Sequence, residues 1–127
     1  MVHTERINPA GLDWRRFVVA VDDEAHAIGC GQVKPHRDGS RELASLVVVP
    51  AWRGRGVARA IIEHLVASHP GKLYLTCRAE LGPLYEKFGF RAISPSEMTP
   101  YFRKLVRLAG VFELLAHESM LVMVREG

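Results

Sequence analysis

A change of hydrophobic period near the middle of the chain constrains the fold more than any other feature. An apolar run ends at Pro50, and apolar residues then recur at the spacing of a helix. They are Ala58, Ile61, Ile62, Leu65 and Val66. Pro70-Gly71 ends this helix, and "KLYLTC" (72–77) reads as a strand. Because a strand, a helix and a strand form a crossover unit, strands 42–49 and 72–77 are predicted to be parallel.

The segments before this unit predict further strands. β-branched and apolar residues indicate a hairpin of strands 16–21 and 27–33, followed by an Asp38-Gly39 turn that leads into strand 42–49. Gly29 and Gly31 suggest a close neighbour or a bulge in the second strand. The apolar end of strand 42–49 implies that it is buried on both faces.

The second half of the chain completes an α/β pattern. The predicted elements are a short helix at 81–90 ended by Gly89, a strand at 90–94, a loop at 95–99, an amphipathic helix at about 100–116 that Gly110 could end or kink, and a strand at 119–126. Residues 1–13 read as a polar lead-in. The predicted fold is α/β, with a mixed, mainly antiparallel central sheet flanked by helices, in a single domain over residues 1–127.

The composition limits the kinds of protein, site and ligand that are expected for this chain. A chain of 127 residues with 48% hydrophobic and 24% charged residues suits one soluble domain. No apolar run reaches the length of a membrane span, and the N-terminus has no apolar signal region, so a cytoplasmic protein is expected. Cys30 and Cys77 read as buried free thiols, and the six scattered histidines predict no metal site. A net charge of +3 permits an anionic ligand without requiring nucleic acid.

Alternating arginines and glycines, Arg53-Gly54-Arg55-Gly56, occupy the junction between strand 42–49 and the following helix. A helix N-terminus leaves backbone N–H groups unpaired and carries partial positive charge, and glycines let a ligand approach it closely. Together with Arg59, the junction therefore predicts a phosphate cradle. It lacks the Lys-Ser/Thr of a P-loop and the spacing of a dinucleotide fingerprint. The alternative is a tight turn with solvated arginines.

Two motifs at this junction and beyond resemble the GCN5-related N-acetyltransferases, the GNAT superfamily. The pattern V-x-P-x-x-R-G-x-G-x-A runs from Val48 to Ala58 and is similar to the family's acyl-CoA signature. The ending "LYEKFGF" is similar to the family's Y-x-x-x-G-F, met by Tyr85, Gly89 and Phe90. The resemblance covers about residues 16 to 94. It implies that the parallel strands splay at a bulge.

The resemblance also implies a site for acetyl-CoA, used as a co-substrate without a metal. The pyrophosphate is expected on the backbone N–H groups from Arg55 to Ala58, and the pantetheine arm on the backbone of strand 42–49. The thioester carbonyl is expected near the N–H of Val48. The expected donor-binding residues are Leu46, Val47, Val48, Val49, Arg53, Gly54, Arg55, Gly56, Val57, Ala58 and Arg59.

Transfer to an amine needs a base and an acid, since an alkylammonium has a pKa of roughly 10. The resemblance assigns the acid to Tyr85, whose alternative is a half-buried core aromatic. It assigns the base to Glu42, for which a water chain, with Glu42 as a solvated strand-end residue near Arg41 or Arg37, is an equal alternative. Cys77 is expected to be a structural thiol rather than a nucleophile.

Three departures from the family concern the acceptor side. A typical member begins with a strand and two helices before the strand at 16–21, and here about fifteen residues precede it. Helix 100–116 is an insertion that either covers the core or replaces the missing wall. The segment "TCRAELG" (76–82) lacks the family's habitual asparagine.

The expected function is acetyl-CoA-dependent N-acetylation of an amine, either a small molecule or a peptide, by direct attack. The alternative is a catalytically degenerate acyl-CoA sensor or interaction module. A nucleic-acid binder is disfavoured, because basic strands and aromatic platforms are missing. A homodimer is a fair expectation, since a missing layer would expose apolar sheet surface.

Overall fold

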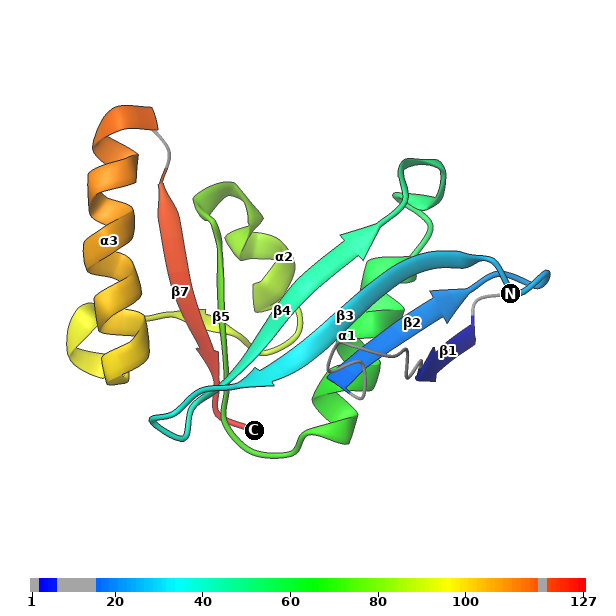
Figure 1. The fold of residues 1–127 in the computed structure, drawn as a ribbon, viewed down its shortest axis with the longest axis horizontal. Coiled ribbons are helices and arrows are strands. Elements are labelled where there is room, and N and C mark those ends of the chain that lie inside the picture. The colour runs from blue at the N-terminus through cyan, green and yellow to red at the C-terminus, as the bar shows by residue number, and fades with distance from the viewer. Residues whose placement is uncertain (1–2, 7–15, 117–118) are drawn as a thin grey trace. The chain divides into compact units, whose positions relative to one another are not determined.

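A computed structural model describes residues 3–6, 16–116 and 119–127. The strands are β1 (His3–Arg6), β2 (Phe17–Val21), β3 (Ala27–Pro35), β4 (Arg41–Val48), β5 (Leu73–Arg78), β6 (Arg91–Ala92) and β7 (Met120–Arg125). The α-helices are α1 (Val57–Ser68), α2 (Gly82–Glu86) and α3 (Pro100–Ala116), with short 3-10 turns η2 (Pro50–Trp52), η3 (Ala79–Leu81) and η4 (Pro95–Glu97). The strand order is β1-β2-β3-β4-β5-β7-β6 (Figure 1).

The chain forms two compact units. The first contains residues 1–34 and 43–70, and the second contains residues 35–42 and 71–127. The pairing of β4 with β5 is parallel and places Glu42 opposite Tyr74, near the start of both strands. The mixed, mainly antiparallel sheet with one parallel pair, flanked by helices, is therefore confirmed. The assignment of all 127 residues to a single domain stays a prediction.

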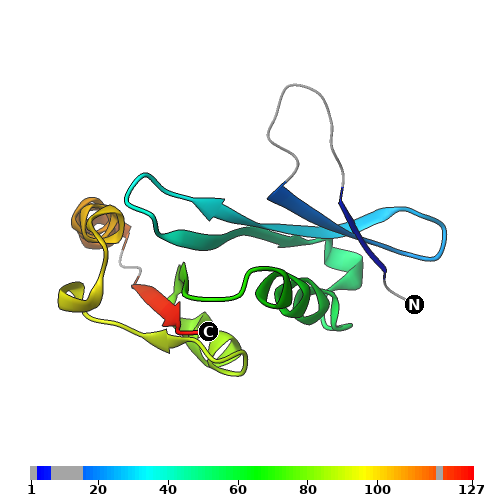
Figure 2. The same ribbon diagram turned by 90° about the horizontal axis from the view of Figure 1, so that it is seen from below.

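In the first unit, antiparallel strands carry one helix. β1 pairs with β2 and β2 with β3, and β4 returns beside β3 (Figure 1). α1 lies along one face of these strands (Figure 2). Its apolar stripe is the one that the helical period predicts, because Val57, Ile61, Ile62 and Leu65 are all buried.

Two glycines of β3 let α1 approach the sheet closely. A methyl group on Gly31 would lie 2.8 Å from Cγ2 of Ile61, and one on Gly29 would lie 2.9 Å from the carbonyl oxygen of Val47. The register with β2 also shifts between Ala20 and Val21. The predicted close neighbour and a β3 irregularity are both present.

The end of β4 differs from its prediction. Val47 is 55% exposed and Val49 is 36% exposed, so this apolar run is not buried on both faces. Ser45, just before it, has a φ of 56°, which is unusual for a residue other than glycine and costs about 1 kcal/mol. A hydrogen bond of 2.8 Å from Gln32 Nε2 to Ser45 Oγ holds this irregular point against β3. Val47 and Val49 beyond it face outward, where burial was expected, and Leu46 and Val48 are partly buried.

In the second unit, β7 lies between β5 and β6 and is antiparallel to both. One face of these strands carries Tyr74, Val122 and Val124, which pack with Met98 and with Phe102 of α3. Side chains alternate along a strand, so Leu121 projects from the opposite face, and there it meets Gly82 of α2. α2 and α3 therefore cover opposite faces, and α3 has the predicted core-covering role (Figure 2).

Several predicted boundaries need correction. The polar lead-in contains a strand, β1, since edge pairing uses backbone groups and needs no apolar pattern. The predicted helix at 81–90 shortens to the five-residue α2, which η3 precedes, and the predicted strand at 90–94 shortens to β6. The predicted loop at 95–99 contains η4, closed by a capping box between Ser94 and Glu97. Gly110 does not end α3.

No helix in the described ranges is both long enough and apolar enough to cross a membrane.

Replacing Gly31 by alanine should destabilise the fold by about 1–3 kcal/mol, because the added methyl group overlaps Ile61. The double variant Gly31→Ala/Ile61→Ala removes that overlap, so its loss should be smaller than the sum of the two single losses by at least about 0.5 kcal/mol. Urea unfolding of the four proteins measures this coupling. Strictly additive losses would show that the close approach is not required.

Candidate functional site

The junction between β4 and α1 exposes the start of a helix. Gly54 and Gly56 have φ values of 76° and 85°, a conformation that favours glycine. The first backbone bond of α1 runs from the N–H of Ala60 to the carbonyl of Gly56, so the N–H groups of residues 57–59 precede the helical ladder. Within the described residues, the N-cap Gly56 makes no side-chain cap and the first turn has no acidic residue. The N–H groups of residues 57–59 and the positive end of the helix dipole are therefore available to an anion.

The three arginines at this junction each have a protein partner. Arg53 Nε donates to the carbonyl of Val48 at 3.1 Å, and the guanidinium of Arg55 lies 5.0 Å from the ring centre of Trp52. Arg59 pairs with Glu63 at 2.7 Å on the exposed surface of α1. An exposed pair of this kind contributes little, so Arg59 can turn toward a ligand at small cost. All three arginines are nonetheless exposed to solvent.

The backbone at the end of β4 is only partly available to a ligand. The N–H of Val49 donates to Ile28 of β3 at 2.9 Å, and the carbonyl of Val49 accepts the N–H of Trp52. Successive residues of a strand direct their backbone groups to opposite sides, so the N–H of Val48 points away from β3. Among residues 46–49, Val48 thus offers a donor on that outer side, and Val49 does not.

This junction fits a pyrophosphate. Among the described residues, apart from its immediate chain neighbours, a Cβ atom on Gly54 or Gly56 would meet no atom within 4 Å, so there is open space beside the helix start. Next to it lie the outward-facing apolar side chains of Val47 and Val49, which an apolar part of the same ligand could cover. Open space, unpaired donors and apolar surface together suit a ligand with an anionic group and a thin apolar arm.

The ending of α2 explains the motif Y-x-x-x-G-F in physical terms. The N–H of Phe90 donates to the carbonyl of Tyr85, and the N–H of Gly89 donates to Glu86, which is the bonding pattern of a Schellman motif. Gly89 supplies the left-handed residue, with a φ of 91°. The Phe90 ring meets the Tyr85 ring edge-on at 6.2 Å, the apolar contact that accompanies this motif. Arg125 Nε donates to the carbonyl of Phe88 at 3.0 Å and secures the turn to β7.

Tyr85 is buried and lies near Cys77. Burial, followed by the charge of Cys77, raises the pKa of Tyr85 above that of an ordinary tyrosine. The hydroxyl therefore stays protonated at neutral pH, as a proton donor must. Cys77 and Cys30 are free, half-buried thiols, and burial raises the pKa of each, so neither has the thiolate character of a nucleophile.

Glu42 is buried, with an exposed fraction of 8%, so the alternative of a solvated strand-end glutamate is wrong. Its Oε1 lies 2.8 Å from Nε2 of His36, across the turn that joins β3 to β4. The sequence analysis did not identify His36 as a partner of Glu42, although the predicted Asp38-Gly39 turn indicates that the segments on either side of it face each other. Tyr101 of α3, which stacks on His36, was also missed.

The two proposed proton-transfer residues lie on opposite faces of β5. Glu42 contacts His36, whose ring packs against Tyr101 and Phe102 on the α3 face. Tyr85 belongs to α2 and lies near Cys77, on the other face. The two side chains are therefore not placed beside each other.

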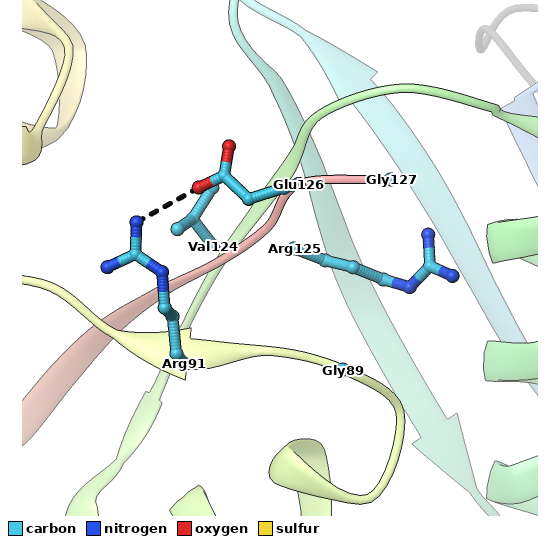
Figure 3. Close-up of a pocket in the computed structure, with 6 residues that line it drawn as sticks. All are labelled: Gly89, Arg91, Val124, Arg125, Glu126 and Gly127. Atoms are coloured by element: carbon cyan, nitrogen blue, oxygen red, sulfur yellow. Dashed lines mark hydrogen bonds and ion pairs between the residues drawn. The ribbon is translucent and has the colours of Figure 1, made fainter.

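A separate hollow of about 260 Å³ lies at the C-terminal end of β7 (Figure 3). It is lined by Gly89, Arg91, Val124, Arg125, Glu126 and Gly127. Arg91 and Glu126 form an ion pair at 3.0 Å on its wall. None of the sequence-predicted site residues lines this hollow. In the described part of the chain, no three His, Cys, Asp or Glu side chains are grouped to hold a metal ion.

Comparison with known proteins identifies the family. The family described as acetyltransferase (GNAT) domain matches residues 13–92. The sequence matches no curated protein. The expected homodimer and cytoplasmic location stay predictions.

Three solved structures share the fold. N-acetylglutamate synthase from Neisseria gonorrhoeae, complexed with coenzyme A and N-acetyl-glutamate, is 16% identical with a TM-score of 0.77, over 99% of this chain and 35% of that chain. IAA acetyltransferase from Bacillus cereus is 19% identical, with a TM-score of 0.70 over the full length of both chains. The Mycobacterium tuberculosis protein Rv2747, in complex with CoA, is 18% identical with a TM-score of 0.66, over 90% of this chain and 77% of that chain. This chain thus spans about a third of the synthase.

Replacing Gly89 by alanine should destabilise the protein by about 1–2 kcal/mol, because alanine disfavours a positive φ. Gly89→Asn is the matched control, since asparagine tolerates the left-handed region and should lose less. Urea unfolding compares the two. Equal losses would mean that crowding by Arg125, rather than backbone conformation, selects glycine here.

Proposed function

The chain belongs to the GNAT family of acetyltransferases, and from this membership we propose that it transfers an acetyl group from acetyl-CoA to an amine by direct attack. The observation that carries the proposal is the start of α1. Its first N–H groups precede the helical ladder, and Gly54 and Gly56 leave the space beside them open.

Donor binding uses backbone groups for the pyrophosphate and for the pantetheine arm. The N–H groups from Arg55 to Ala58 hold the pyrophosphate, with Arg53, Arg55 and Arg59 adding charge. The arm lies along Leu46–Val49 and covers the exposed side chains of Val47 and Val49. The N–H of Val48 polarises the thioester carbonyl, since Val49 N–H is committed to Ile28.

The reaction moves protons away from the amine nitrogen and onto the CoA sulfur. The acceptor is mostly an ammonium at neutral pH because its pKa is roughly 10, so Glu42 takes one proton from it before attack. The amine nitrogen then attacks the thioester carbonyl carbon, the C–S bond breaks, CoA leaves as a thiolate, and the nitrogen releases its second proton to solvent as the amide forms. Tyr85 gives a proton to the thiolate. Acid and base act on sulfur and nitrogen respectively, so their placement on opposite faces of β5 is compatible with both roles.

The acceptor is a small-molecule or peptide amine. The similar N-acetylglutamate synthase from Neisseria gonorrhoeae is complexed with N-acetyl-glutamate in one structure and with L-arginine in another. An acceptor panel should therefore include α-amino acids beside polyamines and peptide N-termini.

Acetyl-CoA should bind, and Gly56→Ala should weaken that binding by about tenfold or more, because the methyl group projects into the cradle. Gly39→Ala is the matched control: Gly39 also has a positive φ, of 88°, and also has open space around it, but it lies in the β3–β4 turn. Calorimetric titration with acetyl-CoA measures both. Equal weakening by the two variants would argue against the cradle.

Turnover should appear as amine-dependent release of CoA thiol. Tyr85→Phe and Glu42→Gln should each lower kcat by roughly 10²-fold or more. The raised pKa of Tyr85 places the alkaline loss of activity above the usual tyrosine range, because the acid works only while protonated. Tyr85→Phe should abolish this alkaline limb.

Tight acetyl-CoA binding without turnover on any amine would favour the alternative, a degenerate acyl-CoA sensor. Absence of binding would contradict both functions. Full activity of Glu42→Gln across pH would show that a water chain, and not Glu42, acts as the base.

A further inference from the structure

The buried pair of His36 and Glu42 is not accounted for by core packing alone. The side chains are 7% and 11% exposed, and their polar atoms are 2.8 Å apart. Burying a carboxylate is costly unless a donor compensates for the lost water. The Glu42 carboxylate is therefore held in the second unit by a specific partner.

The ring of His36 is fixed from several directions. Tyr101 stacks on it with ring centres 3.6 Å apart and planes inclined by 15°, and Phe102 meets it edge-on at 5.8 Å. Its backbone is fixed as well, because the N–H of His36 donates to Ser40 and its carbonyl accepts the N–H of Gly39. A ring that cannot turn presents Nε2 to Glu42 in one direction.

The helix that supplies this clamp is itself tied to the same turn. Asp38 Oδ2 accepts the backbone N–H of Tyr101 at 3.0 Å, and Oδ1 accepts the N–H of Ser40. The hydroxyl of Ser40 and then these N–H donors hold the pKa of Asp38 well below its usual range. Asp38 thus remains an acceptor at neutral pH and keeps the first turn of α3 over His36.

We propose that His36 is a positioning residue for Glu42 in the acetyl transfer. Nε2–H donates to Oε1 and fixes the carboxylate, and Oε2 receives the proton that leaves the amine nitrogen. The role rests on the proposed function. His36 touches neither reactant and acts through Glu42.

A matched pair of variants tests the position of the donor. The side-chain amide of His36→Gln can place an N–H near the site of Nε2, whereas that of His36→Asn lies nearer the site of Nδ1 and is too short. We expect His36→Asn to lower kcat by about tenfold or more with an unchanged KM for acetyl-CoA, and His36→Gln to retain most of the rate. His26→Asn, at an exposed histidine of the first unit, is the control for the substitution itself.

A spectroscopic measurement gives a readout independent of turnover. In ¹⁵N imidazole spectra of the wild type, His36 should be protonated at Nε2, and Glu42→Gln should shift that resonance. An unprotonated Nε2 in the wild type would overturn the proposal, because no donor would then reach Oε1.

The outcomes distinguish failure of the positioning role of His36 from failure of the proposed acetyltransferase function. Wild-type turnover with equal rates for His36→Gln and His36→Asn would overturn the positioning role and leave the acetyltransferase function standing. Equal loss in both, with a raised KM for acetyl-CoA, would indicate a structural role and would also overturn it. No wild-type turnover on any amine would overturn the function, and the positioning role with it.

Discussion

The close approach of α1 to β3 is the packing constraint on which the donor side depends. Gly29 and Gly31 remove the side chains that would hold the helix away from the sheet, and Ile61 and Leu65 occupy the space. α1 begins directly after the turn that follows β4, so seating the helix also directs its first N–H groups. The same turn therefore joins the exposed apolar end of β4 to a helix start that has no side-chain cap.

The two proton-transfer candidates are held by different physical means. Tyr85 sits in a helix ending whose geometry is set by backbone bonds and by the conformation of Gly89. Its burial keeps the hydroxyl neutral. Glu42 is kept in place by a side chain, His36, which is in turn clamped by an aromatic ring. The proposed acid is thus fixed by local structure, whereas the proposed base depends on residues from separate elements.

Sequence reasoning succeeded where the chemistry is local. The period change predicted α1, the glycines of β3 predicted a close neighbour, and Gly89 was predicted to end the short helix, which the structure completes as a Schellman turn. It failed where burial depends on distant partners. Apolar residues at Val47 and Val49 predicted a core, because hydropathy does not distinguish surface covered by protein from surface left outside. The pairing of His36 with Glu42 needs the hairpin to close and α3 to return from sixty residues later in the sequence.

The bond from Arg125 to the carbonyl of Phe88 has a consequence for how relatives diverge. The segment shared with the family ends at residue 92, yet Arg125 and Tyr101 lie beyond it. The shared segment therefore contains Tyr85 and Glu42, the proposed acid and base, without all of the contacts that orient them. Two relatives could match in every motif and still hold the residues equivalent to Tyr85 or Glu42 differently, because a change in β7 alters the bond from Arg125 and a change in α3 alters the rings that pack on His36.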